Sequence, residues 1–60
     1  MPRKNELVDI IAILVHETER AFLIDDGGDE KIWLPKSLVE HNDDGTFTMP
    51  VWLAAEKELI

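Results

Sequence analysis

The sequence contains no cysteine. Neither disulfide bonds nor thiolate metal sites can therefore support the fold, and the chain is compatible with a reducing cytoplasm. Its length of 60 residues lies near the lower limit for a single hydrophobic core, because a domain of this size buries only about 60% of the surface that its unfolded chain exposes. We therefore expect one domain of marginal stability, held together by packing or by self-association.

Long apolar runs and basic residues are also scarce. The longest apolar run, from Ile10 to Val15, is far shorter than the ~20 residues that span a bilayer. Residues 1–6 are not followed by the pattern of a signal peptide, so we expect a soluble, cytoplasmic protein. Six basic against thirteen acidic residues give a net charge of −7. This charge opposes nucleic-acid binding and is typical of a solubilising surface; a partner with a basic surface is the alternative.

Short apolar runs separated by polar turns predict five β-strands. They cover residues 7–15, 20–24, 31–34, 38–41 and 46–49. The first run is apolar on both faces, so we expect both faces to be covered. We expect residues 1–6 to form a disordered N-terminal arm and residues 7–60 to form a single domain.

A Gly-Gly pair predicts the turn and the register of the first hairpin. Gly27 and Gly28 can both adopt the positive φ of a two-residue turn. A turn at these residues sets Phe22 opposite Trp33 as a cross-strand aromatic pair. Pro35 then ends the third strand, because proline has no backbone N–H for the ladder. The other face of the hairpin carries aliphatic residues, namely Ala21, Leu23, Ile32 and Leu34.

The second half of the chain predicts another hairpin and a helix. An Asn-Asp-Asp-Gly turn begins at Asn42, and the expected core members of this hairpin are Leu38, Phe47 and Met49. Pro50 suits the first position of a helix that extends to Leu59. Its expected buried stripe consists of Val51, Trp52, Ala55 and Leu59. Because a helix this short has only marginal stability by itself, we expect it to lie against the first strand.

These elements predict a mainly β fold. We expect a five-stranded antiparallel meander, either a curved sheet or an SH3-like barrel, with a C-terminal helix.

Two segments carry a resemblance to known proteins. WLPKSLVE, from Trp33 to Glu40, and DGTFTMPVWLAAEKELI, from Asp44 to Ile60, resemble very short proteins encoded in bacteriophage and prophage genomes. In that group a W-L-P-K-S segment is followed by an acidic hairpin and a P-x-W-L-A helix ending in a Lys and two apolar residues. The resemblance, which extends over residues 20–60, implies a phage or prophage accessory product in the cytoplasm of a bacterial host. It supplies no mechanism.

Two groups of side chains contain residue types that can bind metal ions. Four carboxylates crowd the first hairpin turn, and they are Asp25, Asp26, Asp29 and Glu30. Carboxylates suit Ca²⁺, but this spacing lacks the alternate ligands and the closing Glu of an EF-hand loop, so we interpret the segment as a solvated turn. The imidazoles, His16 and His41, have no zinc-binding spacing and are interpreted as surface residues at strand ends. We predict no metal and no cofactor.

Ser37 follows Lys36, which suggests an activated nucleophile. Activation requires a base within reach and an oxyanion hole, for which so small a domain has little room. A serine at a strand break is more often a turn or cap residue. We therefore predict that the protein is not an enzyme.

Trp33 is the strongest candidate for contact with a partner. If Trp33 pairs with Phe22 and the helix leaves it uncovered, an aromatic patch ringed by cations results. Its members are Arg20, Phe22, Lys31, Trp33 and Lys36. Such a patch can hold single-stranded nucleic acid, but on an acidic protein it is more often a site for a protein partner or for self-association.

Our leading hypothesis is therefore a non-enzymatic module that binds a protein partner or itself, with a homodimer expected from the doubly apolar first strand and the small core. The first alternative is an acidic inhibitor of a host nucleic-acid-binding protein, in which carboxylates stand in for phosphates. These carboxylates are Asp25, Asp26, Asp29, Glu30, Asp43 and Asp44. The second alternative is weak binding of single strands through Trp33. We expect no membrane partner.

Overall fold

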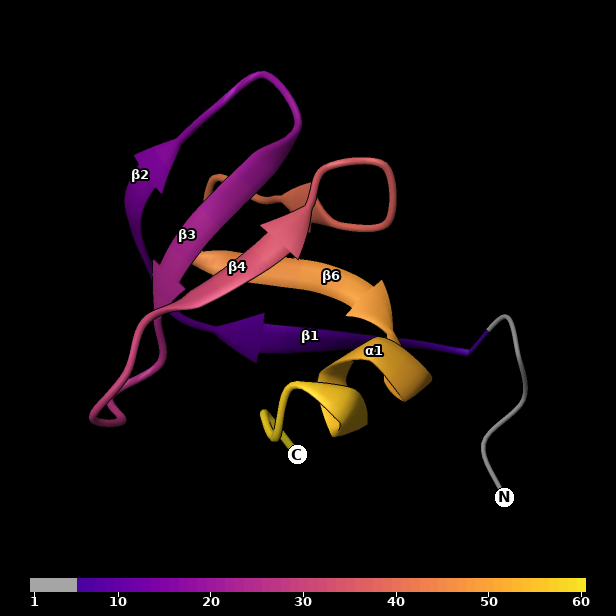
Figure 1. Ribbon diagram of the computed structural model, residues 1–60. Helices are drawn as coiled ribbons and strands as arrows, with labels where there is room; N and C mark the ends of the chain where they lie inside the picture. The colour runs from indigo at the N-terminus through magenta and orange to yellow at the C-terminus, as the bar shows by residue number, and fades with distance from the viewer. Residues whose placement is uncertain (1–5) are drawn as a thin grey trace.

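A computed structural model describes residues 6–60. Its elements are β1 (Leu7–Ile11), β2 (Ile13–Glu17), β3 (Ala21–Asp25), β4 (Ile32–Pro35), β5 (Glu40–His41), β6 (Thr46–Pro50) and α1 (Val51–Glu56). They form two three-stranded antiparallel sheets, β1-β6-β5 and β2-β3-β4, with the helix at the end of the chain (Figure 1). The predicted mainly β fold with a C-terminal helix is confirmed. The predicted N-terminal arm lies outside the described residues, except for Glu6.

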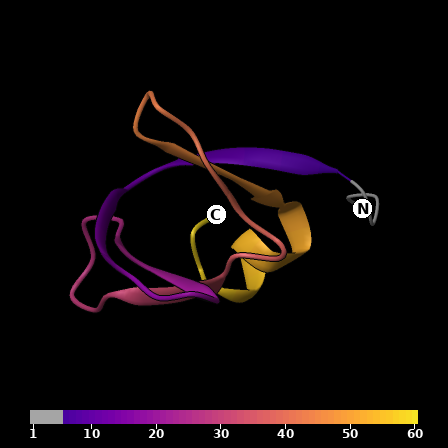
Figure 2. The ribbon, with the colours of Figure 1, turned by 90° about the horizontal axis from the view of Figure 1, so that it is seen from above.

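The predicted first strand is divided into β1 and β2, which is why six strands are present instead of five. Ala12 lies between them, is almost fully buried and donates its N–H to the carbonyl of Gly45. β1 pairs with β6, whereas β2 pairs with β3. Figure 2 shows this part of the chain curving from one sheet toward the other. The bend at a small residue therefore lets one continuous segment belong to both sheets, which do not close into a barrel.

Only one face of this bent segment is buried. Ile10 and Ala12 belong to the core, and Val8 and Leu14 pack against it. The opposite face is exposed, and its apolar residues are Leu7, Ile11, Ile13 and Val15. The prediction that both faces are covered is therefore wrong for the isolated chain. The reason is that α1, the element expected to cover the second face, contacts β1 and β6 over the core.

β3 and β4 pair one residue out of the predicted register. Phe22 lies opposite Leu34, and Leu23 lies opposite Trp33. The connection is longer than a two-residue turn, because β3 ends at Asp25 and β4 begins at Ile32. Gly27 alone of the glycine pair has a positive φ, of 97°. A slip of one residue moves every side chain to the other face of a strand. The predicted Phe22–Trp33 pair is therefore wrong.

The second hairpin shows a similar shift. Asn42 donates its N–H to the carbonyl of Thr46, and Gly45, with φ of 87°, closes the intervening turn. Val39 is buried in place of the predicted Leu38, which is 40% exposed. The predicted burial of Phe47 and Met49 is confirmed, and the largest fully buried side chains are Phe47, Ile24, Leu34 and Met49.

α1 is shorter than predicted and buries a different stripe. Pro50 is the last residue of β6, opposite Leu7, so the helix begins at Val51. Leu53 and Ala54 are therefore buried, whereas Trp52 is 45% exposed. The prediction that Trp52 belongs to the core is wrong.

The helix ends by folding back onto the core. Glu58, with φ of 60°, turns the chain, and Leu59 donates its N–H to the carbonyl of Ala54 at 2.8 Å. This geometry satisfies a carbonyl at the helix end and returns Leu59 to the core, against which its side chain packs.

Candidate functional site

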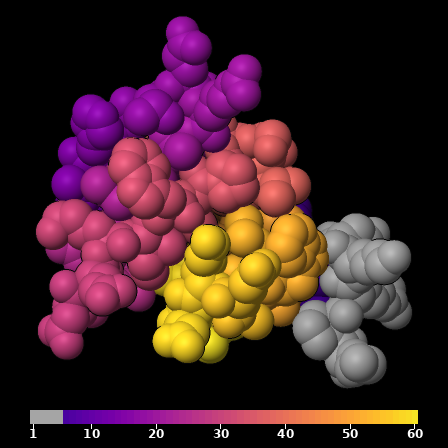
Figure 3. Space-filling view, viewed as in Figure 1, coloured from indigo at the N-terminus to yellow at the C-terminus, as the bar shows by residue number. Residues whose placement is uncertain are grey.

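The outer face of the β2-β3-β4 sheet carries a row of three side chains, here called the Trp33 surface. His16 on β2 lies opposite Leu23 on β3, which in turn lies opposite Trp33 on β4. The rings of His16 and Trp33 meet edge to face, with centroids 6.3 Å apart. Trp33 is 47% exposed, His16 is exposed and Leu23 is half-buried between them. The β4 side of the molecule is seen in Figure 3.

The backbone holds the Trp33 surface in place. Lys36 donates its N–H to the carbonyl of Arg20 at 2.8 Å, which makes these two a hydrogen-bonded pair of the β3-β4 ladder. Because such pairs alternate, Leu23 and Trp33 form a non-hydrogen-bonded pair, the type in which side chains lie closest. The Trp33 side chain therefore lies close to that of Leu23 on the outer face of the sheet.

The structure does not bring the five predicted patch residues together. Phe22 is 8% exposed and points to the core, away from Trp33. The Lys36 Nζ lies 5.2 Å from the centre of the Phe22 ring and forms an ion pair with Glu17. Arg20 and Lys31 are exposed at opposite ends of the hairpin. Of the predicted aromatic pair, only Trp33 is available to a partner.

An aromatic cluster links the two sheets and was missed from the sequence. His41 on β5 stacks on Phe47 of β6, with ring centroids 4.6 Å apart and an interplanar angle of 10°. Phe22 on β3 meets both rings at 5.8 and 5.7 Å. The expectation of His41 as a surface residue overlooked this contact. The sequence did contain an indication of this contact. Val39 and His41 are two residues apart, so their side chains lie on the same face of a strand.

The ion pair between Glu17 and Lys36 predicts a pH effect. The hydrogen bond from Lys36, and then its charge, lower the pKa of Glu17 below its usual value of 4.5. A carboxyl whose pKa is lowered by folding stabilises the fold above its unfolded pKa and loses this contribution as the pH falls through the folded value. Glu17→Gln should therefore lower the thermal midpoint slightly at neutral pH, and the difference from the unmodified protein should vanish at a pH well below 4.5.

Thermal unfolding of both proteins at the two pH values measures this effect. The effect is small because both side chains are accessible to solvent, which screens the interaction. An equal difference at both pH values would contradict the assignment to the Glu17 charge. Lys36→Met, which removes the cation instead, should reproduce the pattern.

Three of the six carboxylates of the predicted acidic surface accept hydrogen bonds within their own turns. Gly27 and Gly28 donate N–H groups to the side chains of Asp25 and Asp26 at 2.9 and 3.0 Å. Asp44 accepts from the hydroxyl and the N–H of Thr46, and these hydrogen bonds lower its pKa. The other members, Asp29, Glu30 and Asp43, are exposed. Within residues 6–60, no three His, Asp or Glu side chains are grouped so as to hold a metal ion.

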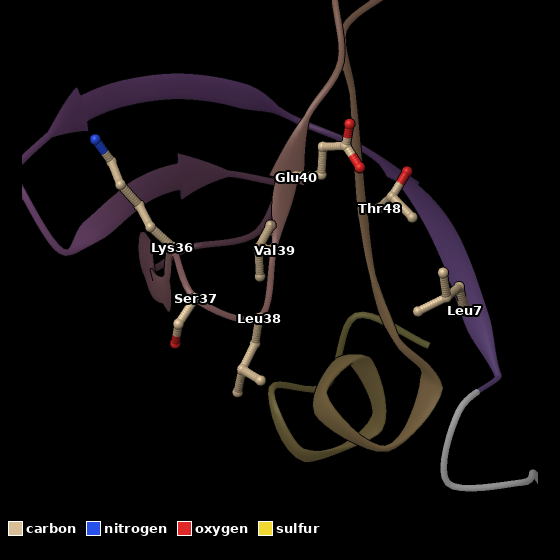
Figure 4. Close-up of a pocket in the computed structure, with 7 residues that line it drawn as sticks. All are labelled: Leu7, Lys36, Ser37, Leu38, Val39, Glu40 and Thr48. Carbon is tan, nitrogen blue, oxygen red and sulfur yellow. The ribbon is translucent and has the colours of Figure 1, made fainter.

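A shallow hollow of about 400 Å³ lies beside the turn that follows β4. It is lined by Leu7, Lys36, Ser37, Leu38, Val39, Glu40 and Thr48 (Figure 4). The Ser37 hydroxyl points away from the Lys36 ammonium group (Figure 4). The pair considered as an activated nucleophile is therefore not assembled in this conformation.

Two further results do not concern a particular site. Over residues 6–60, no helix has the length and apolar character needed to cross a bilayer. The sequence matches no model of a known protein family, no curated protein and no solved structure.

Proposed function

We propose that the protein is a non-enzymatic interaction module that binds a protein partner through the Trp33 surface. The observation that carries this proposal is the half-exposed Trp33 on a sheet whose core is complete without it. The resemblance of its sequence to short phage and prophage proteins supports a role as an accessory product in the cytoplasm of a bacterial host.

Trp33 has the properties of an interface anchor. Tryptophan is enriched among the residues that dominate binding energy, because a large rigid side chain buries much area at little entropic cost. Leu23 adds an apolar base, and His16 adds a polar edge. A central aromatic residue with a polar margin matches the anatomy of protein interfaces.

The two alternatives are less well supported. A single-strand binder needs several aromatic side chains on which successive bases stack, together with cations, but Phe22 is buried and Lys36 is paired with Glu17. An acidic mimic of nucleic acid needs carboxylates free to meet a basic partner, whereas Asp25 and Asp26 accept hydrogen bonds in their own turn.

We also propose that the fold is a partly open relative of the SH3-like barrel. This is supported by the bent β1–β2 segment, which pairs with β3 at one end and with β6 at the other. The opening lies between β4 and β5, which share no ladder.

The proposal predicts that Trp33→Ala strongly weakens binding of the partner while the fold is retained. Loss of an interface anchor costs about 2 kcal/mol or more, or roughly thirty-fold in affinity. Affinity capture from a bacterial host lysate identifies the partner, and titration calorimetry with that partner then measures the loss.

Trp52→Ala is the matched control, because Trp52 is exposed to a similar extent, 45%, but lies on α1. Retained affinity in Trp33→Ala, or an equal loss in Trp52→Ala, would refute the Trp33 surface as the binding site. A salt titration with a single-stranded oligonucleotide tests the alternative: binding that weakens with salt and is lost in Trp33→Ala would favour nucleic acid.

A further inference from the structure

The outer edge of β1 has backbone groups that no strand of the described chain satisfies. In an antiparallel ladder, alternate residues bond to the neighbouring strand and the rest point away from it. Val51 donates its N–H to the carbonyl of Glu6 at 2.9 Å, and Ala12 donates to Gly45 at 3.3 Å. These bonds assign the even-numbered residues of this segment to the ladder with β6. Leu7, Asp9 and Ile11 therefore direct their N–H and C=O groups to the opposite edge.

This edge has less protection than the other strand edges of the described chain. The β2 edge is also five residues long, but it contains a β-bulge between Leu14 and His16 and ends in the charged Glu17. β6 lies along one side of β1, and no strand of residues 6–60 lies along the other (Figure 1). Natural proteins shield free edges by making them short or by placing proline or charges on them. β5 has only two residues, and β4 ends in Pro35. β1 has five residues, no proline and one charge, Asp9.

The side chains on this edge are also apolar and exposed. Leu7 is 61% exposed and Ile11 is 81% exposed. Both project from the outer face, and both belong to residues whose backbone is unpaired. An exposed apolar edge strand is a template for the addition of another strand.

We propose that β1 pairs antiparallel with β1 of a second copy of this chain, about a two-fold axis at Asp9. In this register Leu7 lies opposite Ile11 of the second copy and Ile11 opposite its Leu7, so apolar side chains meet on both sides of the axis. The same residues exchange backbone hydrogen bonds. The two β1-β6-β5 sheets thereby become one continuous sheet, and the interface is isologous, as two-fold symmetry requires.

Asp9 determines how tight this pairing can be. Like charges directly opposite each other destabilise a strand pair. The Asp9 carboxylate, however, accepts a hydrogen bond from the Thr48 hydroxyl at 2.6 Å, which holds it over β6 and away from the axis. Repulsion is therefore reduced but not removed. The remaining repulsion between the two Asp9 carboxylates and the net charge of −7 on each copy indicate a weak dimer. Salt should strengthen this dimer, because it screens the repulsion.

This dimer goes beyond the proposed function, because it uses β1 and leaves the Trp33 surface free. Sedimentation equilibrium should show a dimer with a dissociation constant of roughly 100 µM, in keeping with a small interface. Asp9→Asn, which keeps an acceptor for Thr48, should tighten it. Ile11→Thr should weaken it about tenfold while the fold is retained, since Ile11 is exposed and threonine favours strands.

Ile13→Thr is the matched control. Ile13 is 70% exposed on the same bent segment, but it belongs to β2 and pairs with Asp25. Its replacement should leave the dimer unchanged, and so should Trp33→Ala, which separates this test from that of the proposed function. Equal weakening by Ile13→Thr and Ile11→Thr would overturn edge pairing in favour of unspecific apolar association.

Amide hydrogen exchange provides a direct readout of the ladder. The N–H groups of Leu7, Asp9 and Ile11 should exchange rapidly in dilute solution and become protected as the concentration rises, whereas those of Val8 and Ile10 should be protected throughout. A monomer at high micromolar concentration, or a dimer in which the Leu7, Asp9 and Ile11 amides stay unprotected, would refute the proposal.

Discussion

Phe47→Ala is expected to unfold a large part of the protein at room temperature. The Phe47 side chain is fully buried, lies opposite Ile10 of β1 and contacts the rings of His41 and Phe22. Phe47 therefore connects β6 both to its two neighbouring strands, β1 and β5, and to the other sheet. Truncation of a buried phenylalanine costs about 3–5 kcal/mol. At about 0.05–0.15 kcal/mol per residue, this loss is comparable with the entire stability of so small a domain.

Urea unfolding followed by circular dichroism measures this loss. Phe47→Leu is the control, because it keeps most of the apolar volume and should cost clearly less than the alanine variant. His41→Ala removes only the exposed member of the stack and should also cost less. An unchanged urea midpoint in Phe47→Ala would mean that Phe47 does not join the two sheets.

The strands and turns could be predicted from the sequence, but the register of the hairpins could not. Both turns lie where the sequence predicted them and contain a glycine with positive φ, at Gly27 and Gly45, whereas Gly28, which was also expected to have a positive φ, does not. The first hairpin does not have the predicted register, and in the second Val39 is buried instead of the predicted Leu38. Side chains of Asp25 and Asp26 cap the N–H groups of the first turn and lengthen it. The length of such a loop depends on local hydrogen bonds rather than on the pattern of apolar residues.

This shift in the register of the first hairpin determines which side chains lie beside Trp33. It separates Phe22 from Trp33 and replaces the expected aromatic pair with Leu23 and Trp33. Trp33 could be identified from the sequence as a candidate, whereas the row that it forms with His16 could not. A β-bulge between Leu14 and His16 sets that row, and the sequence contains no proline or glycine there to indicate it.

The same chain uses its exposed apolar residues in two different settings. Trp33 lies at one end of a row across three paired strands, on the short edge strand β4, which ends in Pro35, and its side chain is exposed on the outer face of the sheet. Leu7 and Ile11 lie on a strand with one free edge, so both backbone and side chains are available. The first setting suits side-chain recognition of a partner, and the second suits strand addition. The two proposals are therefore compatible, because they use different surfaces of the same small domain.

The attachment of α1 should depend on Leu53 and not on Trp52. A helix of six residues is not stable by itself in water, so its stability must come from the side chains that it buries. Leu53 is 3% exposed, and Leu53→Ala should cost about 2–5 kcal/mol. Trp52 is the larger residue but is 45% exposed, and Trp52→Ala should cost about 0.5 kcal/mol or less.

Urea unfolding gives both free energies, and proteolysis reports whether α1 has detached. Detachment would expose Ala54, which is buried on α1, so Leu53→Ala should be cleaved near the C-terminus much faster than Trp52→Ala. The opposite order of stabilities would show that α1 buries the stripe predicted from the sequence. In that case Trp52 would belong to the core and could no longer serve as the exposed counterpart of Trp33.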